Sequence, residues 1–446
     1  MKILLINPPR SPENSILKYA PDEARRYIHK KLIGPPLGLM TIAKAVEDFD
    51  TVLFDMKGEY DLDETTPPLR ELARKLVEEH KPDIVGVTFI ASEFNYGIEI
   101  FQETKSINPS ILTVAGGLHV TLCPGDFTDP SVDVLCPGHG AEKFRKIVTA
   151  KIEGKPLEEI KGLILNKNGN QVFTGERHET ADPVTDGFLM PDRSLLERWK
   201  STYKTAESTI PSTYLYTSLG CPYNCVFCSI WPQYGGRFYQ REVESVISEL
   251  KSITDYEIVR FADANTIVNV DFIDRLFDRI KEEGIQKFFI MDIRADTAVN
   301  HPALIEKLAK NGLKVVICGF ESYKDEELKR YNKNSKAGLI SRAIDIFHDN
   351  GIKLRGNYVI PNDYDDDDFK AMADYASSHK VVYAGYTILT PMPGTVMYEE
   401  MKDLIIDHDL SKYNFFNSVL KTKLPLDKFY ENVGRLWLIK KGSEII

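Results

Sequence analysis

The 446-residue sequence predicts an α/β protein with two successive parallel-sheet domains. Residues 1–154 alternate short apolar runs with segments whose apolar residues recur at helical spacing, and residues 205–408 repeat this pattern. The chain is also long for one domain. A hydrophobic content of 43% and a charged content of 27% are typical of a globular protein that can bury a sizeable core.

In the first domain, five apolar runs predict buried strands and four amphipathic segments predict helices between them. This alternation predicts a parallel sheet wrapped by helices, with ligands bound at the carboxyl ends of the strands. The predicted strands are residues 2–6, 51–55, 84–88, 111–115 and 132–135. The predicted helices are residues 37–46, 69–79, 96–106 and 142–151.

The loops at those strand ends are rich in glycine and proline. Glycine permits close approach of a ligand to the backbone, and proline fixes the shape of a loop. Each loop by itself is also an ordinary turn of an α/β domain. The candidate binding residues in these loops are Pro8, Pro9, Pro35, Gly38, Ser92, Gly116, Gly117, His119, Thr121 and Glu142.

Residues 155–204 predict a linker, because the regular alternation weakens there. Asn168 and Gly169 separate two short β-type runs and indicate a small hairpin. Residues 182–193 are rich in proline, aspartate and glycine, which favours an irregular connection.

The second domain, residues 205–408, predicts six β/α units arranged as an open partial barrel, with chemistry at the carboxyl ends of the strands. The acidic run 363–368 indicates a helix start rather than a metal site. Residues 409–446 predict a helical tail whose aromatic side chains pack against the barrel, although such a tail could also cover a substrate entrance. The predicted strands are 212–217, 257–262, 287–292, 314–319, 353–360 and 381–389, and the predicted helices are 242–253, 270–283, 302–310, 325–330, 336–350 and 426–439.

The stretch TSLGCPYNCVFCS, residues 217–229, places Cys221, Cys225 and Cys228 in a C-x3-C-x2-C array just after the first strand of this domain. Three soft thiolates on one short loop can hold iron in a sulfide cluster. A structural zinc site would need a fourth ligand nearby, and no cysteine or histidine follows within the next seventy residues. A disulfide would leave one thiol over, and unconnected cysteines remain the third alternative.

With Phe227 directly before its last cysteine, this array resembles that of the radical S-adenosylmethionine (SAM) enzymes. The resemblance implies that the three cysteines hold a [4Fe-4S] cluster whose open iron chelates SAM. It also implies SAM contacts for Phe227 in the cysteine loop and for Arg294 and Glu321, which follow barrel strands. Asp263 stands where other members carry Gly-Gly-Glu, so the contact to the amino group of SAM stays open. Structural pairing between barrel loops is the alternative for each polar residue.

Together, the loops of the first domain resemble the Rossmann-like (flavodoxin-like) cobalamin-binding domain that precedes the barrel in one radical SAM subfamily. The resemblance implies that the candidate loop residues bind cobalamin. The chain lacks the D-x-H-x-x-G motif whose histidine ligates cobalt. His119 could be a ligand or only a hydrogen-bonding residue, and the loop 89–95 is a candidate for the lower face of cobalt.

The resemblance implies a cobalamin-dependent radical SAM C-methyltransferase that uses methylcobalamin and a 5′-deoxyadenosyl radical on an unactivated sp3 carbon. Residues 7–39 and the short tail resemble methanogen enzymes that methylate a glutamine of methyl-coenzyme M reductase, an anaerobic post-translational modification. The expected partners are then that protein or peptide substrate and an electron donor such as ferredoxin or flavodoxin. The alternatives are a tetrapyrrole-type cyclase or oxidase, a methylase of a small molecule, and a non-catalytic cobalamin- or cluster-binding protein.

Composition argues against two classes of partner. The net charge of −10 and the absence of a Lys/Arg cluster argue against nucleic-acid binding. No apolar stretch approaches the length that spans a bilayer, and the first apolar run, residues 1–6, is too short for a signal peptide. A cytoplasmic location is expected, because thiols stay reduced there.

Overall fold

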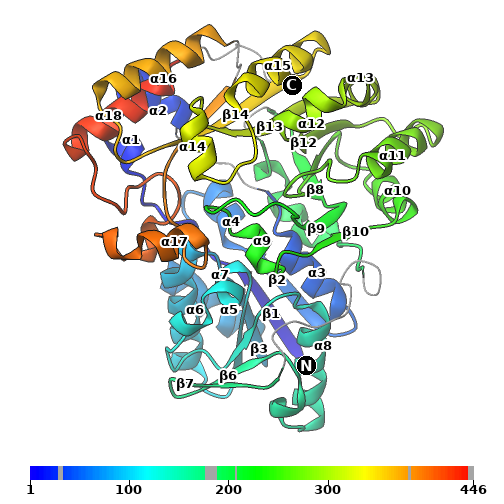
Figure 1. The fold of residues 1–446 in the computed structure, drawn as a ribbon. Helices are drawn as coiled ribbons and strands as arrows, with labels where there is room; N and C mark the ends of the chain where they lie inside the picture. Colours follow the sequence, from blue (N-terminus) through cyan, green and yellow to red (C-terminus); the bar gives the residue numbers. More distant parts are fainter. Residues whose placement is uncertain (29–33, 176–187, 206–207, 380–382, 440–446) are drawn as a thin grey trace. The chain divides into compact units, whose positions relative to one another are not determined.

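The computed structural model describes residues 1–28, 34–175, 188–205, 208–379 and 383–439. The chain forms two compact units, coloured along the sequence in Figure 1. The first unit comprises Met1–Pro12, Pro35–Tyr203 and Pro232–Gly235. The second comprises Glu13–Gly34, Lys204–Trp231 and Gly236–Ile446.

The first unit is built on a seven-stranded sheet of order β2-β1-β3-β4-β5-β6-β7. The first five strands in this order are parallel, and β6 and β7 are antiparallel. Each parallel strand lies within two residues of its predicted bounds at either end, because unbroken apolar runs mark strands buried on both faces. The strands are β1 (Lys2–Asn7), β2 (Asp50–Asp55), β3 (Ile84–Thr88), β4 (Leu112–Gly116), β5 (Val134–Cys136), β6 (Ile164–Lys167) and β7 (Asn170–Phe173).

Helices cover both faces of this sheet, with α5 and α6 on one face and α3 and α8 on the other (Figure 1). Their apolar stripes face the strands, as the helical spacing predicts. Two short helices at the carboxyl edge of the sheet, α4 and α7, were not predicted. The helices are α3 (Leu37–Ala45), α4 (Met56–Leu62), α5 (Leu69–His80), α6 (Phe94–Ile107), α7 (Leu118–Leu122) and α8 (Ala141–Glu153).

The predicted linker is instead part of the first unit. Its hairpin, β6 and β7, extends the sheet by pairing with β5. The following 3-10 helix η4 (Arg193–Thr202) is anchored by Trp199, whose indole N–H donates to the carboxylate of Glu59 at 2.7 Å. The Tyr203 hydroxyl donates to Asp55 at 2.9 Å. Hydrogen bonds to buried carboxylates therefore fix this segment, while residues 176–187 lie outside the described residues.

The second unit contains a six-stranded parallel sheet of order β15-β14-β13-β12-β11-β8, the predicted order of an open partial barrel. The hairpin of β9 (Ser218–Gly220) and β10 (Phe238–Gln240) frames the cysteine stretch. The beginning of the predicted strand 381–389 lies outside the described residues. The strands are β8 (Ser212–Leu215), β11 (Ile258–Phe261), β12 (Phe288–Asp292), β13 (Leu313–Glu321), β14 (Lys353–Ile360) and β15 (Tyr383–Ile388).

Except for α17, whose Met397 packs with Tyr331 and Leu389, the helices that follow the strands share one continuous apolar core with this sheet (Figure 1). The acidic run opens α16 as predicted, with Asp365 forming a capping box with Asp368. The helices are α10 (Val243–Ser252), α11 (Val270–Glu282), α12 (Ala295–Asn300), α13 (Pro302–Lys310), α14 (Asp325–Arg330), α15 (Ala337–Asp349), α16 (Asp366–Ser378), α17 (Val396–Met401) and α18 (Leu426–Leu436).

The predicted first domain, residues 1–154, includes residues 13–34. In the structure, these residues belong to the second unit. Helices α1 (Ser15–Tyr19) and α2 (Asp22–Ile28) bury one apolar face in the barrel core. Tyr19 stacks on Tyr430 of α18 at 5.6 Å between ring centroids. The C-terminal tail therefore packs on the barrel as predicted, and it does so together with an N-terminal segment. No helix of the described chain is long and apolar enough to cross a membrane.

Candidate active site

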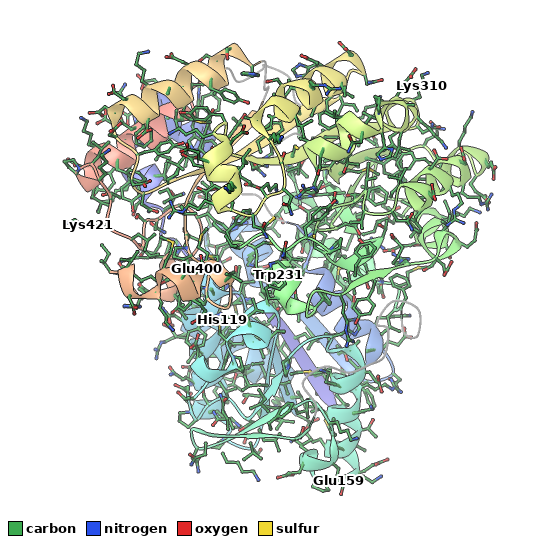
Figure 2. The ribbon with its side chains drawn as sticks, in the orientation of Figure 1. His119, Glu159, Trp231, Lys310, Glu400 and Lys421 are labelled. Carbon is green, nitrogen blue, oxygen red and sulfur yellow. The ribbon has the colours of Figure 1, made fainter. Side chains whose placement is uncertain are left out.

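The three predicted cluster ligands lie on one turn between β9 and the short helix α9 (Ile230–Gln233). Cys225 is buried, Cys221 and Cys228 are half-buried, and none of them forms a disulfide. The carbonyl of Cys225 accepts the amide N–H of Cys228 at 3.1 Å and the indole N–H of Trp231 at 3.0 Å. Trp231 is labelled in Figure 2. The turn is thus closed by local hydrogen bonds, and the disulfide alternative is not realised.

The three sulfurs do not form a compact site for a single ion. Among the described residues, His119, Cys123 and Asp126 form the one group of three or more His, Cys, Asp or Glu ligand atoms that all lie within 4.8 Å of one another. A structural zinc site needs such a compact set. Three thiolates on a wider turn suit an iron–sulfur cluster, in which each thiolate binds a different iron.

The thiols of the turn are held in their neutral form. Burial raises the pKa of Cys221, Cys225 and Cys228, and the neighbouring thiols add to this effect. The charge of Lys333 lowers the pKa of all three. Binding of iron must therefore displace protons from these sulfurs, which makes assembly of a cluster dependent on pH.

Asp263 follows β11 and ties down the chain that leads into the cysteine turn. One carboxylate oxygen accepts the backbone N–H groups of Thr217 and Ser218, at 2.9 and 2.5 Å, and both of their hydroxyls, at 3.1 and 2.6 Å. Burial raises its pKa to about 6, although these hydrogen bonds lower it. Its other oxygen is buried without a hydrogen-bond partner in the described chain. Asp263 therefore positions the cysteine loop, and its predicted contact with SAM stays a prediction.

Arg294 follows β12 and is buried beside the same turn. Its guanidinium lies 4.0 Å from the ring centroid of Tyr223, which stands between the first two cysteines. It pairs with Asp296 at 2.8 Å and donates to the backbone carbonyls of Lys333 and Asn334, at 3.0 and 3.3 Å. Arg294 thus joins the end of β12, the cysteine turn and the segment after α14.

Glu321 ends β13 in a left-handed backbone conformation, with φ of +61°. Non-glycine residues rarely adopt this conformation, and it is concentrated at functional sites. The Glu321 carboxylate lies 2.8 Å from the ammonium of Lys333, and both side chains are nearly buried. Gly319 makes room for this pair, because a Cβ there would collide with Glu321 and lie 3.0 Å from Nζ of Lys333.

Phe227 packs edge-on against the buried ring of Tyr331, at 5.7 Å between ring centroids. The neighbouring amide of Val226 donates to the Tyr331 carbonyl at 3.2 Å, and the Val226 carbonyl accepts the amide of Met397 at 2.9 Å. The aromatic residue before the last cysteine therefore anchors the turn to the segment after α14. Its predicted contact with SAM stays a prediction.

In the first unit, the loops after β3, β4 and β5 are linked to one another. The Phe89 amide donates to Gly116, and the Thr121 hydroxyl joins the carbonyl of Gly117 to the amide of Gly138, at 2.9 Å each. Gly117 has φ of +100°, and a Cβ there would lie 2.8 Å from the Phe89 nitrogen, so only glycine fits. The loops form one connected backbone surface at the carboxyl edge of the sheet.

The remaining loop candidates differ in exposure. Pro8, Pro35 and Ser92 are buried, Pro9 is half-buried, and Gly38 is exposed, with no atom within 4 Å of the place that a Cβ would take. Open space beside an exposed glycine at this edge suits the close approach of a large ligand. Glu142 lies in the first turn of α8 and pairs with Lys146 at 2.5 Å in a solvent-exposed ion pair. The fit to cobalamin therefore rests on the backbone of these loops.

His119 is only 2% exposed and lies on α7, where Figure 2 labels it. Its ring contacts Phe94 and Phe127, and its Nε2 lies 2.9 Å from a carboxylate oxygen of Asp126. The ring nitrogen thus lies beside a carboxylate of the first unit without making a hydrogen bond to it, and cobalt ligation and hydrogen bonding both stay predictions for His119.

Two domain families match the chain: the radical SAM superfamily over residues 215–376 and the B12 binding domain over residues 28–148. An uncharacterized methyltransferase of Pyrococcus horikoshii is 30% identical over 437 residues, which are 95% of this chain and 88% of that protein. The chain belongs to the cobalamin-dependent radical SAM methyltransferases. The cofactors of this methyltransferase are a [4Fe-4S] cluster, SAM and cobalamin, and it needs an electron donor.

Two further similarities concern more distant proteins. The anaerobic magnesium-protoporphyrin IX monomethyl ester cyclase of Rubrivivax gelatinosus is 25% identical over 390 residues, which are 82% of this chain and 68% of the cyclase. The structure of the radical SAM methyltransferase TsrM from Kitasatospora setae superposes with a TM-score of 0.70 at 17% identity. It covers 97% of this chain and 85% of TsrM, and it shows the same two-domain fold.

Sequence reasoning missed several groups beside the cysteine turn of this methyltransferase. Lys333 belongs to no motif, and Tyr223 stands at an unspecified position of the C-x3-C-x2-C array. Their roles depend on contacts with Glu321 and Arg294. Arg241 is also missed: it is fully buried and donates to the carbonyl of Tyr216 at 2.7 Å. The neighbours of Arg241 in the sequence, Gln240 and Glu242, are polar, so the local sequence does not indicate that Arg241 is buried.

Proposed function

We propose that this methyltransferase adds a methyl group to an unactivated sp3 carbon. The observation that carries this proposal is the presence, in one chain, of a three-cysteine turn at the carboxyl edge of a partial barrel and of a B12 binding domain. When bound, the cluster supplies the electron that cleaves SAM to a 5′-deoxyadenosyl radical, and cobalamin supplies the methyl carrier. The protein's task is to hold and orient these groups and to exclude water.

The residues of the second unit suit the first part of this task. Cys221, Cys225 and Cys228 would hold the cluster, with Asp263 fixing the start of their loop. Arg294 and Glu321 lie beside the turn and offer a cation and an anion to the carboxylate and the amino or hydroxyl groups of SAM. A bound SAM would then compete with Asp296 and Lys333 for these side chains.

The first unit would hold cobalamin at the carboxyl edge of its sheet, where a doubly wound sheet binds its ligand. The linked loops around Gly116, Gly117 and Thr121 present backbone groups there, and Gly38 leaves open space. Pro8, Pro9, Pro35, Ser92, His119 and Glu142 belong to the same proposed set.

For the substrate, we propose a glutamine of methyl-coenzyme M reductase, with ferredoxin or flavodoxin as the electron donor and the cytoplasm as the site of action. Support comes from the resemblance of residues 7–39 to the enzymes that carry out this modification. In the structure, part of this stretch forms α1 and α2, which pack on the barrel and its tail. A methylase acting on a small molecule is the alternative.

The relative from Rubrivivax favours a second candidate, a cyclase acting on a tetrapyrrole. Such an enzyme would share the cysteine turn and the B12 binding domain. The mass of the product separates the two, because ring closure removes hydrogen and methylation adds one carbon.

The experiment is an anaerobic reaction of the protein reconstituted with iron, sulfide and cobalamin, with SAM, a strong reductant and a peptide spanning the candidate glutamine. Formation of 5′-deoxyadenosine and S-adenosylhomocysteine together with a methylated glutamine is the expected result. Both nucleosides without peptide methylation would remove the substrate proposal and leave methyl transfer in place. A parent protein that binds cluster and cobalamin but forms neither nucleoside would contradict the proposed reaction. The negative control is the variant Cys225→Ala, which should form no 5′-deoxyadenosine.

A further inference from the structure

The first unit carries a set of metal-ligating side chains that is separate from the cysteine turn. The ligand atoms of His119, Cys123 and Asp126 all lie within 4.8 Å of one another. Zinc binds nitrogen and oxygen at about 2.0–2.1 Å and sulfur at about 2.3 Å, so that the ligand atoms of a tetrahedral site lie about 3.3–3.6 Å apart. Small shifts of the side chains would therefore let these three atoms share one ion.

The backbone brings the three residues together within eight positions of the sequence. His119 lies in α7, and Cys123 follows four positions later at the end of this helix, where its amide donates to the His119 carbonyl at 2.8 Å. Side chains at this spacing are neighbours on one side of a helix. The next turn, the 3-10 helix η2 (Pro124–Asp126), returns the chain, and the Asp126 amide donates to the Cys123 carbonyl at 3.2 Å.

The imidazole of His119 is the second, independent indication of a ligand at this place. The side chain is 2% exposed, and its Nε2 is buried without a hydrogen-bond partner in the described chain. An Asp126 oxygen lies 2.9 Å from Nε2 but lacks the alignment that a hydrogen bond needs. Phe94 and Phe127 pack on the imidazole, at 5.5 and 5.6 Å between ring centroids, and restrict its orientation. A buried nitrogen of this kind needs a partner, and a metal ion would supply one.

The chemistry of the three groups selects the kind of ion. Imidazole, thiolate and carboxylate are the side-chain ligands of zinc, whereas Mg²⁺ and Ca²⁺ prefer oxygen ligands alone. The Asp126 side chain is 44% exposed and Cys123 is half-buried, so an ion can enter from solvent. Water can then complete a four-coordinate site that has three protein ligands.

We propose that His119, Cys123 and Asp126 bind one Zn²⁺ ion, with water as the fourth ligand. Cys123 binds as a thiolate, and its proton is released to solvent. The ion ties α7 to η2 directly after Gly117. The single lone pair of Nε2 then serves zinc, so the same atom cannot ligate cobalt. The inference goes beyond the proposed function, because it requires neither the cluster nor SAM.

The test is an anaerobic titration of the full chain, without an affinity tag, with Co²⁺ as a spectroscopic substitute for Zn²⁺. The three cysteines of the turn are replaced by alanine in this background chain, so that they cannot bind the ion. One equivalent of Co²⁺ should give a thiolate-to-cobalt charge-transfer band, and Zn²⁺ should remove the band by displacing Co²⁺. Cys123→Ala should abolish the band. Asp126→Asn should weaken Co²⁺ binding at least about tenfold, the lower end of the loss seen even for outer-shell partners.

The matched control is Cys136→Ala, which removes another thiol of the first unit that lies outside the three-residue set. It should leave the band and the affinity unchanged. Zn²⁺ should raise the unfolding temperature of the background chain and of Cys136→Ala, but not that of Cys123→Ala. This comparison separates loss of the site from loss of the fold.

Four results would overturn the proposal and leave His119 and Asp126 as a plain ion pair. They are a background chain without the band, a band that persists in Cys123→Ala, equal losses in Cys123→Ala and Cys136→Ala, and an unchanged affinity in Asp126→Asn. In the parent holoenzyme with iron, sulfide and cobalamin, elemental analysis after addition of Zn²⁺ and desalting should find one zinc per chain, and its absence would also overturn the proposal. Failure to form 5′-deoxyadenosine bears only on the proposed function, because the cobalt titration uses a chain without the cluster cysteines.

Discussion

Replacing Glu249 by leucine removes one partner of a buried ion pair next to the strand that leads to the cysteine turn. The Glu249 carboxylate lies 2.6 Å from Nη1 of Arg241, and the two side chains are 1% and 0% exposed. Arg241 also donates to the carbonyls of Tyr216 and Ser245, at 2.7 and 3.0 Å. Leaving such a guanidinium uncompensated should lower the free energy of unfolding by about 3–5 kcal/mol. Urea unfolding of the apoprotein measures this change.

The double variant Arg241→Met/Glu249→Leu is the matched control. Replacement of a buried pair by apolar side chains of similar volume is often neutral or stabilising, so much of the loss should be recovered. The carbonyl of Tyr216 would still lose a donor, which costs about 1–3 kcal/mol for a buried group. A loss of less than about 1 kcal/mol in Glu249→Leu would refute the uncompensated charge as the cause. So would a double variant whose loss equals the sum of the losses of Arg241→Met and Glu249→Leu.

Two further predictions concern Gly319 and Asp263 of the candidate active site. Gly319→Ala should push apart Glu321 and Lys333 and cost about 1–3 kcal/mol by thermal unfolding, because the new Cβ collides with the buried pair. Gly338→Ala, in a helical position with nothing within 4 Å, should instead be neutral or stabilising, and equal effects of the two changes would contradict the steric argument. Because the pKa of Asp263 is raised from 3.8 to about 6 in the folded apoprotein, the folded chain binds this proton more tightly than the unfolded chain does. The free energy of unfolding should therefore fall by about 3 kcal/mol in total as the pH rises from below 3.8 to above 6. Asp263→Asn should abolish this dependence in urea titrations at several pH values, and an unchanged profile would assign the dependence to other groups.

Most of the secondary structure could be predicted because the two sheets are built from parallel, buried strands. Such strands are unbroken apolar runs, and the helices between them carry apolar stripes at helical spacing. The cysteine turn is equally visible, since its ligands are close together in sequence. These features depend on local chemistry, which the sequence displays directly.

Contacts between distant segments could not be predicted in this way. Helices α1 and α2 were not predicted, and nothing in residues 15–28 themselves shows that they pack on α18. One carboxylate oxygen of Asp263 is hydrogen-bonded to Thr217 and Ser218, and its residue type alone does not show this contact. Lys333 lies in a polar turn of no recognisable motif, and its burial beside Glu321 depends on the course of the chain in space.

The packing of α1 and α2 on α18 has a consequence for how the protein is made. The amide of Ser15 is hydrogen-bonded to the side chain of Asn417, 402 positions later, and Ala20 contacts Gly434 of α18. On the ribosome, α1 and α2 emerge before every strand of the barrel, and they meet α18 only after all of these strands have been made. Their apolar faces stay uncovered during this interval, so a ribosome that stops before α18 releases a chain whose barrel lacks this layer.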